Sequence, residues 1–479
     1  MKTYIGVDLG TSSIKLSLIN SNGVILNEVS ESYPLFQDGL FSEQNPSDWW
    51  NAFETSIDKL LINQNHKDVE GMSFSGQMHG LVMLDEFDKI IRPCILWNDG
   101  RSYQETDFIN KSFGHDKLNN LTGNIAYAGF TAPKIMWVKN NEKHNFLKIN
   151  KIMLPKDYLV YRLTGQFVTD YSDASGTLLL DCKNKCWSEE MLKFCDVKSS
   201  QLPTLHESYD VIGIINDEFK NKHHLGDVKV VMGAGDNAAA SIGMGVIKQG
   251  EVNISLGTSG TIFIPTDHFV KTKKNELHSF ANVTGKWHLM GCILTAASAR
   301  KWWLEDVLKT NDYQEDELDV KNSNSNGLYF LPYLSGERSP HNDVNARGAF
   351  IGLSHNTTKG DMSKAIIEGV SFALKDCLEI AKKEGFSFNK ATICGGGSKS
   401  NQWCQLMANI LNLNIYVGDG SPSLGAALIA VKGCENISFE EACESIEYKK
   451  EFRPELEIVK YYEDKYEIFV KLYPALKCL

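Results

Sequence analysis

The sequence predicts an α/β protein made of two related halves. Strand-like runs alternate with amphipathic helices along the chain, a pattern that is typical of this fold class. The text Leu-Gly-Thr-Ser also occurs twice, each time between two strand-like runs. The second copy lies about half a chain beyond the first, and 479 residues are enough for two to four domains.

The first half begins with a predicted β-hairpin. Residues 4–9 have the pattern of a strand, Gly10-Thr11-Ser12-Ser13 that of a turn, and residues 14–19 that of a second strand. Apolar and polar residues alternate after the turn, and this two-residue period indicates a strand and not a helix. Phosphate loops of the P-loop and Rossmann types lead into a helix, so the sequence disfavours both of those folds.

The second copy predicts a matching hairpin. Its strands are expected at residues 252–256 and 261–264, joined by the turn Gly257-Thr258-Ser259-Gly260. Small residues let a turn point successive backbone N–H groups at a phosphate. A single turn of this kind would be weak evidence for phosphate binding. Its recurrence in the second half predicts a pair of turns that hold phosphate between the two halves. We expect a first domain at 1–245, a second at 250–435 and a helical extension at 436–479.

The other predicted elements follow from periodicity and capping signals. A helix is expected after Asn45-Pro46, and a second from about Asp361 to Gly385. The polar stretch at residues 321–327 is predicted to be a loop. Short apolar runs predict further strands at residues 72–74, 228–232 and 392–394.

Two aspartates are candidate catalytic residues. Asp236 follows a predicted strand on a turn with Gly233 and Gly235, where open α/β sheets bind ligands. It is our candidate general base, which accepts a proton from a hydroxyl that attacks a phosphoryl group. Asp8 precedes the first phosphate turn, and both carboxylates are candidate ligands of Mg²⁺. In each case the alternative is an aspartate that only caps a turn.

Three further clusters could bind ligands. The segment Gln77-Met78-His79 and the residues Trp97, Asp99 and Arg101 offer hydrogen-bonding and aromatic groups that suit a polyol, as does Asn237. A structural histidine and an ordinary surface turn are the alternatives. The third cluster, Gly396, Gly397 and Asn401, lies at a glycine-rich helix start that would let backbone approach a nucleotide. The small residues around Gly425 could pack against another backbone or a nucleotide.

Composition excludes several classes of function. The formal charge of −11 argues against a nucleic-acid-binding protein, and no apolar run approaches the length of a membrane-spanning helix. Eleven cysteines without framework spacing predict reduced thiols and a cytoplasmic protein. Cys182 and Cys186 lack a second ligand pair, so free thiols are favoured over a zinc site.

Together these motifs resemble the FGGY carbohydrate kinases, which belong to the superfamily of actin, hexokinase and the heat-shock chaperone ATPases. Residues 129–137 and 348–353 are similar to family signatures, and the likeness runs in order from about residue 4 to 430. The resemblance implies two actin-like (ribonuclease H-like) ATPase domains with a central interdomain cleft. It also implies ATP and Mg²⁺ as cofactors.

The resemblance further implies a substrate. The segments around Met78 and Trp97 look most like the family members that phosphorylate xylulose, which implies ATP-dependent conversion of D-xylulose to D-xylulose 5-phosphate. In that case Asp236 is the base, and Met78 and His79 contact the sugar. Ala234 stands where many relatives have glycine and could narrow the pocket. A kinase for gluconate, ribulose or glycerol, and a non-kinase actin-like ATPase, are the alternatives. Small molecules are the expected partners, and a homodimer is left open.

Overall fold

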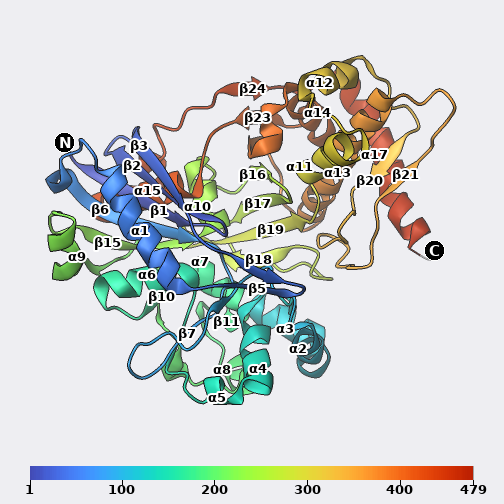
Figure 1. Cartoon of the computed structure of the whole chain (residues 1–479). Coiled ribbons are helices and arrows are strands. Elements are labelled where there is room, and N and C mark those ends of the chain that lie inside the picture. Colours follow the sequence, from blue (N-terminus) through green and yellow to red (C-terminus); the bar gives the residue numbers. More distant parts are fainter. Residues whose placement is uncertain (478–479) are drawn as a thin grey trace.

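The computed structural model describes residues 1–477 and contains two large mixed β-sheets with helices on their faces, each in its own lobe (Figure 1). The first sheet has the spatial order β14 (Val211–Ile214), β15 (Lys229–Gly235), β6 (Val69–Gly76), β1 (Thr3–Leu9), β2 (Ser13–Asn20) and β3 (Ile25–Ser32). The second has the order β18 (His278–Ala281), β19 (Trp287–Ile293), β17 (Gly260–Thr266), β16 (Glu251–Leu256), β22 (Lys390–Cys394), β23 (Asn414–Val417) and β24 (Lys450–Phe452).

The two predicted hairpins are confirmed, and each continues into parallel strands. β1 pairs antiparallel with β2 and parallel with β6, and β6 pairs parallel with β15. In the second sheet β16 pairs antiparallel with β17 and parallel with β22. The predicted strands at residues 72–74, 228–232 and 392–394 lie in β6, β15 and β22, although residue 228 itself precedes β15. Both halves therefore place a hairpin turn beside the carboxyl ends of parallel strands.

The first sheet is covered on both faces. Helices α1 (Pro46–Leu60) and α6 (Pro155–Thr164) pack against the face that contains Ile5, Val7 and Leu9. Helices α10 (Asp236–Gly243) and α15 (Pro422–Glu435) cover the opposite face. The predicted helix after Asn45-Pro46 is α1, and the Asn45 side chain caps it by accepting from Ser47 N.

Helix α15 belongs to the second half of the sequence but packs on the first sheet. A Cβ added at Gly6 would lie 1.9 Å from the Ser423 carbonyl oxygen, and one at Gly425 would lie 1.8 Å from that of Ala239. The small residues around Gly425 thus serve close packing against β1 and α10. The predicted second domain, residues 250–435, contributes this helix to the sheet of the first.

The second sheet is covered by the long helix α13 (Lys359–Lys383), which matches the helix predicted from Asp361 to Gly385. Helices α14 (Asn401–Leu411) and α17 (Leu456–Leu476) pack on α13, and Tyr462 and Phe469 of α17 enter the same core. The carboxyl-terminal extension thus lies on the second lobe. Helix α12 (Tyr313–Asn322) includes the first two residues of the loop predicted at 321–327, so that loop is shorter than expected.

Shorter elements form a third lobe below the first sheet (Figure 1). Its core also takes up Phe280 of β18 and Met290 of β19 in the second sheet, and other elements of this lobe contact β15 of the first sheet. The helices of this region are α2 (Tyr103–Ile109), α3 (His115–Thr122), α4 (Thr131–Asn141), α5 (Lys143–Phe146), α7 (Tyr171–Ala174) and α8 (Glu189–Cys195). Its strands are β4 (Phe36–Asp38), β5 (Phe41–Gln44), β7 (Val82–Leu84), β8 (Cys94–Ile95), β9 (Lys151–Met153), β10 (Val168–Asp170), β11 (Leu180–Asp181), β12 (Cys186–Trp187) and β13 (Thr204–His206).

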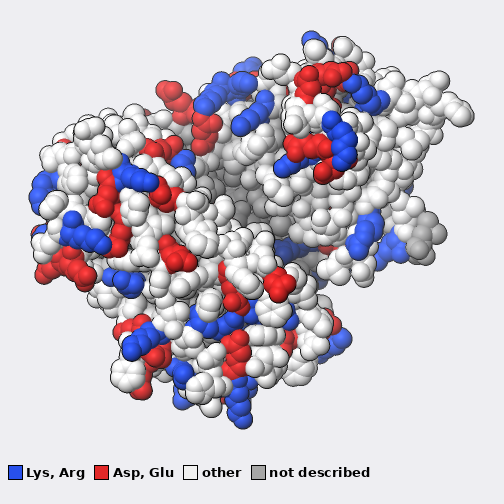
Figure 2. All heavy atoms as spheres, in the orientation of Figure 1, with Lys and Arg blue, Asp and Glu red and all other residues white. Residues whose placement is uncertain are grey.

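The remaining elements are α9 (Asp217–Lys222), α11 (Ala297–Lys301), α16 (Phe439–Ala442), β20 (Tyr329–Leu331) and β21 (Ala349–Ile351). Within residues 1–477 no helix has the length and apolar character that crossing a membrane requires. Lys and Arg side chains are interspersed with Asp and Glu on the face shown in Figure 2, and a deep hollow separates the two large lobes there.

Candidate functional site

Three candidate segments meet at one edge of the first sheet because their strands are adjacent and parallel. Asp8 of β1 pairs with Ser75 of β6, and Gly76 at the end of β6 pairs with Gly235 at the end of β15. The residues that follow β6 and β15 therefore lie side by side, with Asp8 on the next strand. This is the edge at which open α/β sheets bind ligands.

Asp236 is the first residue of α10, whereas the sequence predicted a turn at this position. The helix starts directly after β15 because the run of small residues that follows lets α10 pack closely on α15. Its N-terminus also stabilises a negative charge. Oδ1 of Asp236 accepts hydrogen bonds from Asn237 N at 2.7 Å and from Asn237 Nδ2 at 2.8 Å. The side-chain amide of Asn237 thus holds this carboxylate.

The carboxylate of Asp236 has the properties of a base at neutral pH. Burial raises its pKa to about 6, and the hydrogen bonds from Asn237 act in the opposite direction. A pKa in this range leaves the group ionised at pH 7 while making it a better proton acceptor than an exposed aspartate. A cavity of about 340 Å³ adjoins it and is also lined by Ser255, Gly395 and Ser421, which come from the second half of the chain.

Asp8 lies close enough to Asp236 for their charges to interact. Burial, and then the charge of Asp236, raise the pKa of Asp8 to about 7, against a hydrogen bond from Ser75 Oγ at 3.1 Å and the charge of Lys15. Two carboxylates that oppose each other's ionisation are stabilised by a cation between them. Within residues 1–477 no group of three or more His, Cys, Asp or Glu side chains could hold a metal by itself. The pair fits Mg²⁺, which commonly takes one or two carboxylates plus substrate phosphates.

Met78 lies next to Asp236, and His79 follows it in the loop after β6. A Cβ added at Gly235 would be 3.0 Å from Met78 Sδ, so Met78 packs directly against the residue before Asp236. His79 has a φ of 70°, and its ring stacks on Phe130 with the centroids 4.5 Å apart. Nδ1 of His79 donates to the Gly176 carbonyl at 2.7 Å, and burial lowers the pKa of the ring to about 3. The neutral imidazole therefore keeps Nε2 as an acceptor for a ligand hydroxyl.

The other candidate polyol ligands have partners within the chain. Gln77 is buried, and its Nε2 donates to Gln44 Oε1 at 3.0 Å. Asp99 and Arg101 form a two-bond ion pair of 2.9 and 2.7 Å, and Arg101 also contacts Glu43 at 2.6 Å. Asp99 and Arg101, which the sequence predicts to bind substrate, thus lie in a buried ion-pair cluster with Glu43, a residue remote in sequence. Their role in substrate binding stays a prediction.

The first predicted phosphate turn, Gly10–Ser12, is held by side chains from its own lobe. Gln44 Nε2 donates to the Thr11 carbonyl at 2.7 Å, and Tyr33 OH donates to the Gly10 carbonyl. Trp97 is 42% exposed, and its Nε1 donates to Thr11 Oγ1 at 2.9 Å. Trp97 thus contacts the phosphate turn, and Ser12 is exposed at the tip.

The second predicted phosphate turn, Gly257–Ser259, opens into a large cavity. The Gly257 and Thr258 carbonyls accept from Ala297 N and Ala296 N, each at 2.9 Å. Gly257 and Thr258 line a cavity of about 1080 Å³ together with Gly396, Gly397 and Asn401, whereas Ser259 is not part of its lining. This volume suits a nucleoside triphosphate. Arg300, Lys301, Tyr313, Gln314, Glu317 and Lys321 also line it. Sequence reasoning missed these residues because they carry no motif.

The glycines at the cavity edge have distinct structural reasons. Gly395 has a φ of 91°, and a Cβ there would lie 2.7 Å from the Leu256 carbonyl oxygen. A Cβ at Gly396 would meet no atom within 4 Å, so this position faces open space. Asn401 begins α14, and its Oδ1 accepts from Lys450 Nζ at 2.8 Å.

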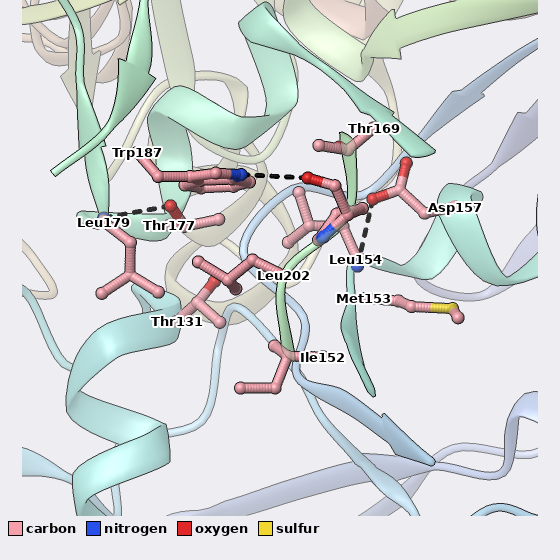
Figure 3. Close-up of a pocket in the computed structure, with 11 residues that line it drawn as sticks. Thr131, Ile152, Met153, Leu154, Asp157, Thr169, Thr177, Leu179, Trp187 and Leu202 are labelled. Atoms are coloured by element: carbon pink, nitrogen blue, oxygen red, sulfur yellow. Dashed lines mark hydrogen bonds between the residues drawn. The ribbon is translucent and has the colours of Figure 1, made fainter. Parts of the chain in front are cut away.

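A separate hollow in the third lobe is not a ligand site. It is lined mainly by apolar side chains, including Ile152, Leu179 and Trp187, and its volume is about 10 Å³ (Figure 3). Such a volume holds at most one water molecule. Trp187 Nε1 donates to the Pro203 carbonyl at 2.9 Å, which fixes the ring over this hollow.

Comparison with known proteins agrees with this arrangement. The model of the FGGY family of carbohydrate kinases matches with its N-terminal domain at residues 3–243 and with its C-terminal domain at residues 252–434. The xylulose kinase of Escherichia coli (strain K12) is 36% identical over 486 residues, which cover 99% of each chain. The crystal structure of a xyloylose kinase from Brucella ovis has a TM-score of 0.95 at 36% identity and covers 99% of both chains.

The structural similarity extends to a kinase with another substrate. Gluconate kinase from Lactobacillus acidophilus also has a TM-score of 0.95, at 28% identity, and covers 99% of this chain and 98% of its own. The fold is thus shared with solved kinases that are named for different sugars. Because both family models match and together span most of the sequence, the chain belongs to the FGGY family of carbohydrate kinases and is an ATP-dependent sugar kinase.

Proposed function

We propose that the chain transfers the γ-phosphoryl group of ATP to the terminal hydroxyl of D-xylulose and forms D-xylulose 5-phosphate. The observation that carries this proposal is the contact of Met78 with Gly235, the residue before Asp236, at adjacent strand ends of the first sheet, with His79 next in the same loop. The xylulose kinase of E. coli is similar over the full length of both chains, which supports xylulose over other sugars.

In the proposed reaction, Asp236 accepts the proton of the attacking hydroxyl as the oxygen bonds to the γ-phosphorus. ADP leaves with the electrons of the broken phosphorus–oxygen bond. His79 Nε2 accepts a hydrogen bond from another hydroxyl of the sugar, and Met78 supplies an apolar wall. These contacts would hold the sugar in line with the phosphate, and positioning of this kind contributes much of the rate enhancement in phosphoryl transfer.

The two turns at Gly10–Ser12 and Gly257–Ser259 would hold the phosphates from opposite lobes. Gly396, Gly397 and Asn401 would contact the nucleoside in the large cavity. When bound, Mg²⁺ would neutralise charge on the phosphates, and Asp8 and Asp236 would hold it. Asn237 is placed to orient Asp236, and Asp99 and Arg101 stay predicted substrate ligands.

A panel of sugars tests the proposal. ADP release by the purified chain is measured in a coupled assay with D-xylulose, D-ribulose, L-ribulose, gluconate and glycerol, and without sugar. The highest kcat/KM is expected for D-xylulose. A higher value for gluconate or glycerol would replace the proposed substrate, and equal ADP release with and without sugar would indicate an ATPase that is not a kinase.

Three earlier expectations stay predictions. The domain limits at residues 245, 250 and 435 are tested by expressing the segments separately. A homodimer is tested by light scattering on the purified chain, and a cytoplasmic location by cell fractionation.

A further inference from the structure

Gln44 connects the first phosphate turn, Gly10–Ser12, with the candidate sugar-binding segment at residues 77–79. It is the last residue of β5, is 3% exposed and uses both ends of its side-chain amide. Nε2 donates to the carbonyl of Thr11 in the first phosphate turn at 2.7 Å. Oε1 accepts from Gln77 Nε2 at 3.0 Å, two residues before His79, and from Trp49 Nε1 at 3.1 Å.

The orientation of this amide has only one solution. Trp49 Nε1 can only donate and the Thr11 carbonyl can only accept, so Oε1 of Gln44 must face Trp49 and Nε2 must face Thr11. Gln77 must then turn its own Nε2 towards Gln44 Oε1. Gln77 Oε1 is left buried without a hydrogen-bond partner in residues 1–477. A buried carbonyl of this kind is stabilised when a hydroxyl or a water molecule binds to it.

The backbone supports the same connection. β5 pairs with β8, with Gln44 opposite Cys94, and Ile95 of β8 forms a bridge with Leu81, which follows the loop of Met78 and His79. Trp97, two residues after β8, donates a hydrogen bond to the Thr11 side chain. We call residues 77–80 the sugar loop. A shift of this loop would move Gln44 and Trp97, which hold the phosphate turn, because buried side chains are close-packed and transmit displacement.

We propose that Gln44 is a positioning residue that couples sugar binding to the geometry of the first phosphate turn, so that sugar and nucleotide bind cooperatively. This inference rests on the proposed function. Without Gln44, the turn loses its link to the sugar loop, and each substrate should bind almost as if the other were absent. Sugar-independent ATP hydrolysis should then form a larger share of total turnover.

The test measures the coupling itself. The Kd of a non-hydrolysable ATP analogue with Mg²⁺ is determined by calorimetry with and without saturating D-xylulose, and the ratio of the two values is the coupling factor. The wild-type chain is expected to show a factor of at least about 5, within the usual range for coupled sites. Gln44→Met, which keeps the volume but loses every hydrogen bond, is expected to reduce the factor to below about 2.

Two further variants separate coupling from stability. Gln44→Glu at pH 8 keeps an acceptor for Trp49 and Gln77 but has no N–H for Thr11, so it should also lose coupling. Trp49→Phe removes one hydrogen bond of Gln44 and opens space in the core but leaves the link from Thr11 to Gln77. It should lower the melting temperature and keep the wild-type factor.

The outcomes distinguish this inference from the proposed function. A wild-type chain that does not phosphorylate D-xylulose refutes the proposed function. If the wild-type chain phosphorylates xylulose but has a coupling factor of 1, only the proposed role of Gln44 is refuted. The same holds if both Gln44 variants keep the wild-type coupling factor. Loss of coupling in Trp49→Phe to the same degree would also refute this role, because destabilisation would then explain the effect.

Discussion

Replacing Asp236 with asparagine should nearly abolish sugar phosphorylation and yet make the ligand-free protein more stable. The two hydrogen bonds that Asn237 donates to Oδ1 can be kept by the asparagine oxygen. The change removes the proton acceptor and the buried charge. Loss of a general base typically lowers kcat by about 100- to 10,000-fold.

The gain in stability follows from the raised pKa. Burial raises the pKa of Asp236 from 3.8 to about 6, so the folded protein binds this proton more tightly than the unfolded chain. The associated stability is complete below pH 3.8 and is lost as the pH rises through about 6. Each unit of difference in pKa between the folded and unfolded states corresponds to about 1.4 kcal/mol. The ionised carboxylate therefore lowers the free energy of unfolding by up to about 3 kcal/mol at neutral pH. Neutral asparagine avoids this cost.

Activity and unfolding are measured on the same preparations. ADP release with D-xylulose gives kcat, and chemical denaturation at pH 7.5 and at lower pH gives the free energy of unfolding. The gain of Asp236→Asn should shrink as the pH falls from about 6 towards about 4. Asp38→Asn, which neutralises an exposed aspartate of β4, should change neither quantity. Near-normal turnover in Asp236→Asn would exclude Asp236 as the base, and a pH-independent change in stability would contradict the electrostatic explanation.

Four further predictions concern pH, metal, the core and closure. The kcat/KM for sugar should fall about tenfold per pH unit below about 6, since Asp236 must be ionised, and a flat profile there would refute this. Asp8→Ala should raise the Mg²⁺ concentration for half-maximal turnover more than the KM for sugar, and an unchanged magnesium titration would count against it. Lys156→Met should lower the free energy of unfolding in a urea titration by about 3–5 kcal/mol, because Lys156 is the buried cation that pairs with Asp157, Asp170 and Asp173. Lys139→Met, which breaks an exposed pair with Asp196, should lower it by less than about 1 kcal/mol, and equal losses would contradict this reasoning. Xylulose with a non-hydrolysable ATP analogue should reduce the radius of gyration in small-angle scattering, because the two phosphate turns lie on different lobes; an unchanged radius with full activity would mean a preassembled site.

The sequence predicted those parts of the fold that local patterns encode. Both hairpins lie where the alternation of apolar residues and the repeated turn placed them. The start of α10 at Asp236 was missed because a glycine-rich strand end followed by alanines is compatible with a turn or a helix. Its close contact with α15, which decides between them, joins residues far apart in the chain.

The same limit applies to the site. The residue types at Asp99 and Arg101 suit a sugar, but their ion pair with each other and with Glu43 depends on tertiary contacts that no local spacing reveals. Gln44 precedes a helix-capping signal, and nothing in its neighbourhood indicates that it connects Thr11 with Gln77. Positioning residues such as Gln44 are found from distances in the structure, whereas candidate residues at strand ends, such as Asp236, can be found from the sequence.

We propose that ATP and D-xylulose react at the edge of the first sheet and form a phosphate ester. Phosphorus NMR of a reaction with limiting ATP detects this ester. We expect one equivalent of ADP and one of a phosphomonoester coupled to the C5 methylene protons, formed at least about 100-fold more slowly by Asp236→Asn. Release of inorganic phosphate in place of the ester, or an ester at another carbon, would contradict it.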